Sequence, residues 1–394
     1  MSPDPNEITT ALREIPVPPT QITTERAIVL GRKAIRRRRN AVTAAAAVAV
    51  VAATAGGFTL ARPGPDSGPL ARPSSTLSPT LPPTRSPAPF PVVFSWTVTP
   101  LPTRGADPIM VTSMDSSGRY IVGSPMASHG AAILWDNLVP VPLPLPVDNV
   151  LNMRPVDVNA SGAVIGNAEG KSGTFAWLYH DGFATALPAP VGGEKNGKYV
   201  ARDINDRGDI LGWSERLGPV VWPASSPSAV RVLGIDDAWA IGDDGTVGGS
   251  LGDGEHPVVV DPDGKSRRLA ENPGRPGGKV FDISGDWASG WVAAENEAHW
   301  MAARWNLRTG ELTYFPDAAS TAVAVSANGA LLSTRGGLGP SVLITPDGRI
   351  IDLPNDAAGQ PSGRAINADG NVIAGNQQRL TNGSSTPAIW RRSP

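Results

Sequence analysis

The sequence predicts an all-β protein, a seven-bladed β-propeller preceded by a single transmembrane helix and a disordered Pro-rich stalk. Three observations support this prediction: the density of chain breakers, a repeat of about 40–45 residues, and one uncharged segment behind a run of arginines. The 394 residues include 44 Gly and 40 Pro but no Cys. So many breakers disfavour helical bundles and doubly wound α/β enzymes. The lack of cysteine excludes disulfides and Cys-ligated zinc.

The first 61 residues predict a membrane anchor. Residues 1–40 carry eight Lys or Arg against four acids and end in the run Arg36 to Arg39. Residues 41–61 carry no charge and contain ten Ala and four Val. As a helix they would span about 31 Å, close to the thickness of the hydrocarbon core. Because the arginines precede the span, the tail 1–40 is predicted to be cytoplasmic and the rest of the chain extracellular. We therefore expect a single-pass protein of the cell membrane.

Other interpretations of this segment stay open. A cleavable signal peptide would explain the basic start, the apolar stretch and the small residues Ala53-Thr54-Ala55, but 40 residues exceed a usual basic n-region. A soluble core helix would need a polar face, which residues 41–61 lack. The arginine run could contact nucleic acid, but beside a membrane span its effect on orientation explains it better. We therefore expect no nucleic-acid partner.

Residues 62–92 predict an extended linker. Ten Pro lie between Pro63 and Pro91, mixed with Ser and Thr, and the large apolar residues before Phe90 are only three leucines. Such a segment cannot bury a core and stays extended and solvated. It is predicted to act as a stalk that holds the following region away from the membrane.

Residues 93–394 consist of about seven copies of one unit. The clearest copies are 156–162, 202–208 and 364–370, which share an apolar residue, a short polar residue and a turn glycine. A second strand follows each turn, a third commonly carries Trp, and a fourth tends to finish in Leu-Pro. The turn positions align at Gly118, Gly162, Gly208, Gly245, Trp287, Gly329 and Gly370. The third strands end near Trp135, Trp177, Trp222, Val260, Trp305, Ile344 and Trp390.

Four short strands in each such unit are typical of propeller blades. The fourth strands are expected at Leu145-Pro146, Leu187-Pro188, Leu233-Gly234, Leu269-Ala270, Phe315-Pro316 and Leu353-Pro354. The seventh unit stops after its third strand at Trp390, whereas residues 92–99 provide a spare strand that carries Trp96. Pairing these two strands would close the ring and leave no open sheet edge.

The phrase Asp203-Ile204-Asn205, followed by turn glycines, a Trp-bearing strand and a Leu-Pro strand, resembles the HAF-type extracellular repeats. The resemblance is best over residues 155–234 and 362–390. It implies a β-propeller of a bacterial surface protein, and the segment 41–61 similarly resembles membrane anchors of high-GC bacteria. The family has no agreed catalytic residues, so the resemblance implies architecture and location only.

Motifs for metal binding or catalysis are weak. The four histidines, His129, His180, His256 and His299, fall in different units without ligand spacing. The stretch Asp157-x-Asn159-x-Ser161-Gly162 begins like a calcium loop but has Ala168 where the loop needs Glu, so a hydrogen-bonded blade turn explains it better. We expect no metal or cofactor. Because no nucleophile-elbow motif is present, the chain is predicted not to be an enzyme.

Two sets of residues are candidates for a site. Asp157, Asp203 and Asp282 share one repeat column on the inner strands, so their carboxyls either converge on the channel or bond the backbone of their own blades. Five further tryptophans depart from the repeat and crowd into the third to fifth units. They either form an aromatic binding face for sugars or peptides or pack in the core. These are Trp213, Trp239, Trp287, Trp291 and Trp300.

The favoured function is a membrane-anchored extracellular propeller that binds an unknown protein, peptide or cell-wall glycan. One alternative is a polysaccharide-acting hydrolase or lyase, with Asp157, Asp203 and Asp282 as acid and base. The other is a surface sensor that signals through the cytoplasmic tail.

Overall fold

The structure is a computed structural model. The predicted tail, transmembrane helix and stalk lie outside the described residues, as do His129 and His299. Among the residues that are described, no helix is long and apolar enough to cross a membrane. The described part is 95–393 without 104–107, 127–130, 147–149, 151, 172, 191–197, 253–254, 296–299, 317–320, 336–338, 356–358 and 380–383.

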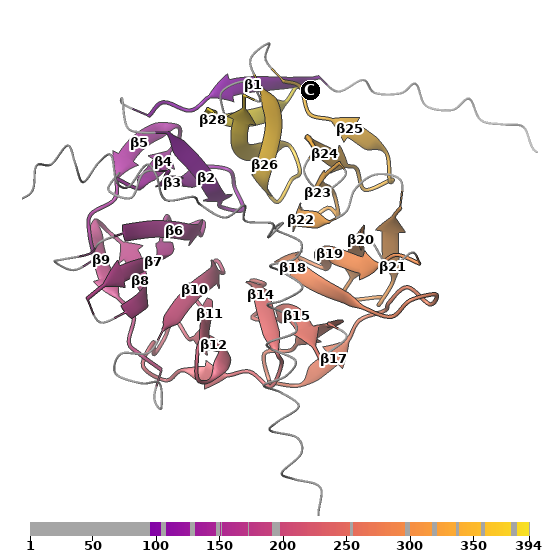
Figure 1. The fold of residues 1–394 in the computed structure, drawn as a ribbon, viewed down its shortest axis with the longest axis horizontal. Helices are drawn as coiled ribbons and strands as arrows, with labels where there is room; N and C mark the ends of the chain where they lie inside the picture. The colour runs from indigo at the N-terminus through magenta and orange to yellow at the C-terminus, as the bar shows by residue number, and fades with distance from the viewer. Residues whose placement is uncertain are drawn as a thin grey trace, which may run out of the picture. The chain divides into compact units, whose positions relative to one another are not determined.

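Seven four-stranded antiparallel sheets surround a central axis, as Figure 1 shows. The prediction of an all-β, seven-bladed propeller is thereby confirmed. In blades 1 to 6 the chain runs from the innermost strand to the outermost before it passes to the next blade.

The strand bounds follow the chain order of the blades. Blade 1 contains β2 (Ile109–Met114), β3 (Tyr120–Pro125), β4 (Ile133–Asp136) and β5 (Val139–Pro142). Blade 2 contains β6 (Asn152–Val158), β7 (Val164–Gly170), β8 (Gly173–His180) and β9 (Phe183–Ala186). Blade 3 contains β10 (Tyr199–Ile204), β11 (Ile210–Ser214), β12 (Gly218–Trp222) and β13 (Arg231–Val232). Blade 4 contains β14 (Asp237–Ile241), β15 (Val247–Leu251), β16 (His256–Val260) and β17 (Ser266–Arg268).

The remaining blades follow the same plan. Blade 5 contains β18 (Gly278–Ser284), β19 (Trp287–Ala293), β20 (Trp300–Asn306) and β21 (Leu312–Phe315). Blade 6 contains β22 (Ala322–Val325), β23 (Leu331–Thr334), β24 (Ser341–Ile344) and β25 (Ile350–Asp352). Blade 7 contains β26 (Gln360–Ile366), β27 (Val372–Gln378), β28 (Ser385–Arg392) and, as its outermost strand, β1 (Trp96–Pro100).

The ring is closed by the first and last strands of the propeller, as predicted. Strand β1 pairs antiparallel with β28, from Trp96 opposite Arg392 to Pro100 opposite Ala388. Beyond the paired residues, Ser393 donates to the carbonyl of Ser95 at 2.7 Å. The first strand of the propeller therefore covers the edge that its last strand would otherwise leave open.

The core is divided among the seven interfaces between blades. Each buried cluster takes residues from two adjacent blades; Trp222, for example, packs with Leu187 and Ala201 between blades 2 and 3. The tryptophans of the repeat, Trp135, Trp177, Trp222, Trp305 and Trp390, are all 0% exposed.

The indole groups of the repeat tryptophans explain why Leu-Pro recurs after the last strand of a blade. The Trp222 Nε1 donates to the carbonyl of Pro188 at 2.9 Å, and the Trp390 Nε1 donates to that of Pro354 at 2.7 Å. Each acceptor follows a buried leucine at the end of the previous blade. The signature therefore joins one blade to the next.

A glycine on the second strand makes room for the indole. A Cβ on Gly212 would lie 2.4 Å from the Trp222 ring and 2.3 Å from the carbonyl oxygen of Val200. Because backbone cannot retreat as a flexible side chain can, only glycine fits at this position.

Three details of the repeat alignment were wrong. In blade 2 the position that aligns with the tryptophans of the other blades is occupied by Tyr179, which lies opposite Val164. Trp177 lies two residues earlier on the same strand. Because side chains alternate along a strand, this displacement keeps Trp177 buried, but its indole nitrogen has no hydrogen-bond partner. In blade 1 the buried leucine is Leu143, whereas Leu145 is 59% exposed.

The third error concerns Trp287, which was aligned with the turn glycines. Blade 5 has a shorter turn, in which Gly285 takes a φ of 55° and Ser284 pairs directly with Trp287. Trp287 is thus the first residue of β19. In the standard turn, represented by blade 3, Gly208 has a φ of 85° and Asn205 Oδ1 accepts from the backbone of Asp209.

Candidate functional site: the central channel and its upper mouth

The ring has two faces, which we define by the inner strands. The upper face is where these strands begin, and the turn face is where they end in the first hairpin turn of each blade. A cavity of about 370 Å³ lies on the axis and is lined by the inner strands of all seven blades. The upper ends are Ile109, Asn152, Tyr199, Asp237, Gly278, Ala322 and Gln360, the first residues of β2, β6, β10, β14, β18, β22 and β26.

Every inner strand contains a β-bulge at the same place. In β10 the register passes from Ala201 opposite Gly212 to Asp203 opposite Leu211, which leaves Arg202 without a partner. The bulge re-aims this extra side chain, and in all seven blades it lines the cavity. We call these residues the bulge ring: Thr112, Val156, Arg202, Trp239, Phe281, Val323 and Arg364.

The three aspartates form part of the next layer of the channel. Asp157 accepts from the Ser113 hydroxyl at 2.5 Å and from the backbone of Ile204 in the next blade at 3.0 Å. Asp203 repeats the pattern with Ile241 of blade 4 at 2.6 Å. These carboxyls therefore bond across blade boundaries.

Asp282 uses both of its oxygens in this way. It accepts from its own neighbour Ile283 at 2.9 Å and from Val325 of blade 6 at 2.7 Å. The carboxyls thus line a common channel, and they accept from backbone of the next blade at all three positions and of their own blade at Asp203 and Asp282.

The pKa values of two of these carboxyls rise. Burial raises the pKa of Asp203 well above its usual range, and the adjacent Asp157, with which it shares a hydrogen bond, raises it further. Burial likewise raises the pKa of Asp282 to about 6, although the backbone donors of Val325 and Ile283 oppose the shift. Asp203 is thus a buried carboxyl of raised pKa that is hydrogen-bonded to a second carboxyl on the channel wall, and such a group can act as a proton donor.

Blades 3, 4 and 5 carry a charged network at the upper mouth. Arg202 donates to Asp237 at 2.5 Å, and Lys279 donates to the same carboxylate at 3.0 Å. Lys279 also pairs with Glu255 at 3.1 Å. Because these cations hydrogen-bond its carboxylate, the pKa of Asp237 is lowered, against the effect of its burial.

Trp239 lies over this network. Its indole nitrogen donates to Asp237 at 2.8 Å, the Arg202 guanidinium stacks 4.3 Å from its ring centroid, and Phe281 meets it edge-on at 6.1 Å. The Trp239 side chain is nevertheless 39% exposed. It is an aromatic surface held in place by ionic contacts rather than a core residue.

A second aromatic pair continues the surface on blade 5. The rings of Trp291 and Trp300 lie 5.5 Å apart at 33°, and Trp300 is 49% exposed. Trp291 stands directly opposite Lys279 in the β18–β19 ladder, so the two side chains share one face of the sheet. Lys279 in turn lies 6.0 Å from the Trp239 ring. Contacts therefore link the strip Trp239–Lys279–Trp291–Trp300, in which Trp291 is only 7% exposed.

The other two candidate tryptophans differ from these. Trp213 is half-buried near the upper end of β11, opposite Val200 and Pro219. Trp287 lies at the turn face, where the Arg304 guanidinium stacks 5.2 Å from its ring. The structure thus places Trp213, Trp239, Trp291 and Trp300 toward the upper face and separates Trp287 from them.

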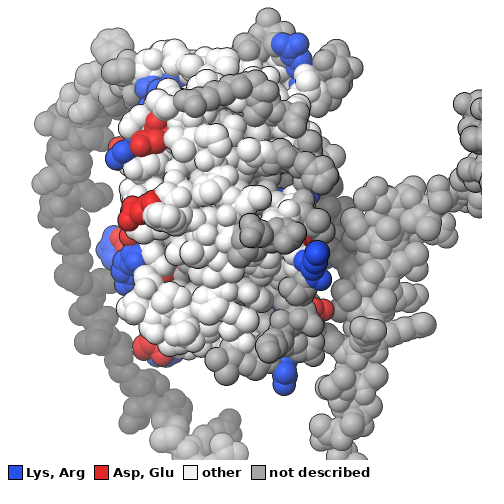
Figure 2. All heavy atoms as spheres, turned by 90° about the vertical axis from the view of Figure 1, so that its left-hand side faces the viewer, with Lys and Arg blue, Asp and Glu red and all other residues white. Residues whose placement is uncertain are grey.

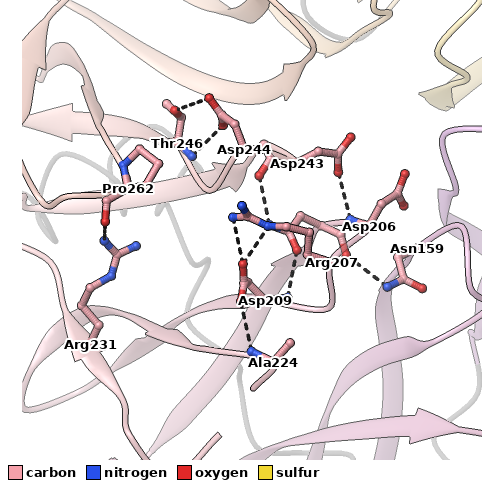
Figure 3. A network of polar contacts seen from close by, with 12 residues as sticks. Asn159, Asp206, Arg207, Asp209, Ala224, Arg231, Asp243, Asp244, Thr246 and Pro262 are labelled. Atoms are coloured by element: carbon pink, nitrogen blue, oxygen red, sulfur yellow. Dashed lines mark hydrogen bonds and ion pairs between the residues drawn. The ribbon is translucent and has the colours of Figure 1, made fainter. Parts of the chain in front are cut away.

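The turn face is tied together by hydrogen bonds between successive blades (Figure 3). Asn159 donates to the carbonyl of Asn205 at 3.1 Å, and the backbone of Asp206 donates to Asp243 at 2.9 Å. The Ser116 hydroxyl of blade 1 also reaches Asp206 of blade 3 at 2.8 Å, across the lower end of the channel. These contacts brace the turn-face end of the cavity, which Ser116, Asp206 and Asp243 line.

The calcium-like stretch of blade 2 is one of these turns. Asn159 Oδ1 accepts from the backbones of Ser161 and Ala163, both at 3.1 Å. Among the described residues, no group of three or more His, Asp or Glu could hold a metal ion. His256 instead pairs with Glu271 at 2.6 Å.

Sequence reasoning missed most of the polar site. Arg202, Asp237, Lys279 and Arg364 were not singled out. Arg202 and Arg364 occupy the repeat position immediately before that of the aspartates, but this position faces the channel only because of the bulge. Since a bulge breaks the alternation of inward and outward side chains, strand periodicity alone does not indicate that this column faces the channel.

No protein-family model matches the sequence, and no curated protein matches it. The HAF-type assignment therefore stays a prediction. Solved structures match the fold: oligogalacturonate lyase from Vibrio parahaemolyticus has a TM-score of 0.52 at 10% identity, covering 76% of this chain and 97% of that chain. Virginiamycin B lyase from Staphylococcus aureus has a TM-score of 0.50 at 15% identity, covering 77% of this chain and 100% of that chain.

The prediction that this chain is not an enzyme is corrected by these likenesses. Propellers of similar fold include lyases, so the lack of a familiar catalytic motif does not exclude catalysis. At such low identity the likeness shows the fold alone, and any chemistry has to be argued from the channel itself.

Proposed function

We propose that the upper face over blades 3 to 5 binds a glycan whose end enters the channel. The observation that carries this proposal is the pair of exposed indoles, Trp239 and Trp300, on a strip that also contains the buried Trp291 and lies beside a network of four charged side chains. Sugar rings have apolar faces that stack on indole and hydroxyl edges that need donors and acceptors. The strip supplies the stacking surface and the network supplies the polar partners.

Exposure separates Trp239 and Trp300 from the structural tryptophans. Trp300 is 49% exposed and Trp239 is 39% exposed, whereas the repeat tryptophans are completely buried. An exposed indole held by Arg202 and Asp237 is ordered before any ligand arrives, which lowers the entropic cost of binding.

The channel favours a glycan over a folded protein. Its volume of about 370 Å³ lies at the lower end of the range for small-molecule pockets, roughly 300–1,000 Å³. The carboxyls inside it offer acceptors that hydroxyl groups can reach, while a flat protein surface would leave them uncovered.

The test is a titration of the full-length protein with neutral and acidic oligosaccharides of three to six units, followed by Trp fluorescence and calorimetry. We expect Trp239→Ala and Trp300→Ala to weaken binding about tenfold each, since one stacked ring contributes roughly 1–2 kcal/mol. Phe183→Ala is the matched control, because Phe183 is a 76% exposed aromatic residue on the outer strand β9. Equal binding by all four proteins would refute the proposed face.

A second candidate function is glycan cleavage by the channel carboxyls. The specific observation is the Asp157–Asp203 pair, which shares a hydrogen bond and in which burial raises the pKa of Asp203. Such a pair can donate a proton to a leaving oxygen or remove one from carbon. Incubation of glycans that bind with the wild type and with Asp203→Asn tests this; the absence of new chain ends with the wild type would exclude cleavage.

We also propose that residues 41–61 anchor the propeller to the membrane, with the tail 1–40 in the cytoplasm. The uncharged Ala-rich stretch behind four arginines supports this. We expect the full-length protein in the membrane fraction, with the propeller accessible to protease added outside intact cells. Recovery of the protein from the culture medium would favour a cleaved signal peptide instead.

A further inference from the structure

The channel is divided into two sectors of different charge. On the side of blades 2, 3 and 5, the layer below the bulge ring carries three carboxyls. On the side of blades 6, 7 and 1, the corresponding residues are Ala324, Ala365 and Ser113, so this sector contributes no acid to that layer.

Arg364 is the cation of the second sector. It is the extra residue of the bulge in β26, its side chain is exposed, and it lines the cavity. Its neighbours in the bulge ring, Val323 and Thr112, are uncharged. Within the described part of the chain, the Arg364 side chain makes no hydrogen bond or ion pair.

Arg202, by contrast, is a cation of the bulge ring whose guanidinium is already engaged by its neighbours. That guanidinium donates to Asp237 and to the carbonyl of Ala238, and it stacks on Trp239. Blade 7 lies across the ring from blades 3 and 4 (Figure 1), so Arg364 faces this network from the opposite wall. It presents unused, forked donors at the mouth where a ligand enters.

We infer that the ligand is an acidic glycan and that Arg364 binds the carboxylate of a uronic acid residue at the mouth of the channel. This inference rests on the proposed glycan-binding function and names the class of glycan. A guanidinium matches the two oxygens of a carboxylate, and a partly enclosed pair is stronger than one on an open surface. The nearest blades carry no acid in the layer below, so the anion avoids the carboxyls on the other wall.

The outer rim over blades 1 and 2 does not offer a comparable attraction for an anionic chain. These blades face the viewer in Figure 2, where the described surface is largely uncharged and the charged side chains lie toward the edges of the view. Exposed Val139 and Phe183 lie on the outer strands of these blades. We therefore assign selectivity for acidic glycans to the channel mouth.

The test compares one uronic acid tetrasaccharide with its fully methyl-esterified form, which keeps the sugar rings and removes the charge. We expect the full-length wild type to bind the acid about tenfold more tightly than the ester, and Arg364→Gln to bind both with the affinity of the wild type for the ester. The control is Arg268→Gln, since Arg268 is exposed on the outer strand β17 and should leave the preference intact.

The outcomes separate this inference from the proposed function. If Arg364→Gln keeps the preference for the acid while its melting temperature is unchanged, the role of Arg364 is overturned. If the wild type binds acid and ester equally and both depend on Trp300, the glycan-binding face stands and the acidic specificity falls. If neither form binds, the inference falls, and the titration with neutral oligosaccharides then decides the proposed function separately.

Discussion

Two sets of tryptophans occupy different regions of this propeller and obey different rules. The repeat tryptophans lie between blades, are 0% exposed, and in most blades donate to a carbonyl of the preceding blade. Of the five candidate tryptophans outside the repeat, all but Trp287 lie toward the upper face of blades 3 to 5, where Trp239 and Trp300 stay partly exposed. The same side chain therefore stabilises the ring in one region and presents a surface in the other.

The difference teaches that departures from a repeat deserve separate treatment. A residue present in nearly every blade is explained by packing that each blade needs. A residue present in only one blade serves no such common need, and its exposure then decides between a local packing role and a surface role. Trp287, which packs beneath Arg304, illustrates the first outcome, and Trp300 illustrates the second.

The largest effect should come from the closing strand, on which all interfaces between blades depend. Deletion of Trp96–Pro100 leaves β28 as an open edge and removes the cover of the seventh blade. We expect loss of cooperative thermal unfolding and aggregation on size-exclusion chromatography. A deletion of residues 70–74, outside the described part, is the control; equal behaviour of the two deletions would contradict the closure.

The comparison itself is tested by paired substitutions. Trp222→Ala removes a fully buried indole and its bond to Pro188, so the free energy of unfolding should fall by about 3–5 kcal/mol. Trp300→Ala should lower it by no more than about 1 kcal/mol, the value of its ring contact with Trp291. Denaturant unfolding measures both, and similar losses would abolish the distinction between the two sets.

The channel carboxyls predict a pH dependence of stability. The pKa of Asp282 is raised to about 6 in the folded protein, so the folded state holds this proton at pH values where the unfolded chain has released it. Stability from this group is present at low pH and is lost as the pH rises through about 6. The raised pKa of Asp203 changes the stability in the same direction.

Asp282→Asn isolates this effect because the amide does not titrate. The wild type should gain about 1–2 kcal/mol between pH 7 and about pH 5 relative to the variant, after allowance for partial solvent contact through the channel. Urea unfolding at several pH values gives the slopes. Parallel slopes for the two proteins would show that Asp282 is ionised throughout this range.

The architecture could be predicted from the sequence because the same strand pattern recurs in seven units. Turn glycines and inner apolar residues recur often enough to specify the number of blades in spite of a local error. The unpaired first strand specifies how the ring closes. Blade 5 shows the limit, since its turn is shorter and Trp287 was misplaced by alignment. The two-residue displacement of Trp177 escaped notice for a similar reason, because burial is unchanged by a shift of two.

The site was predictable only in part. Asp157, Asp203 and Asp282 were found as a column, and Trp239 and Trp300 as departures from the repeat. Arg202 and Arg364 were missed because their position faces the channel only through a bulge. The contact between Asp157 and Asp203 also depends on how closely the inner strands approach, a distance that no single blade encodes.

The pairing of β1 with β28 has a consequence for how this protein is made. Thr97 bonds Arg391, a residue 294 positions later in the chain, so the first strand of the propeller is synthesised long before its partner exists. Contacts of such separation form slowly. A chain released before β28 (Ser385–Arg392) is complete would hold six complete blades and an unfinished seventh. Synthesis of β28 is therefore the step that converts a growing row of sheets into a ring.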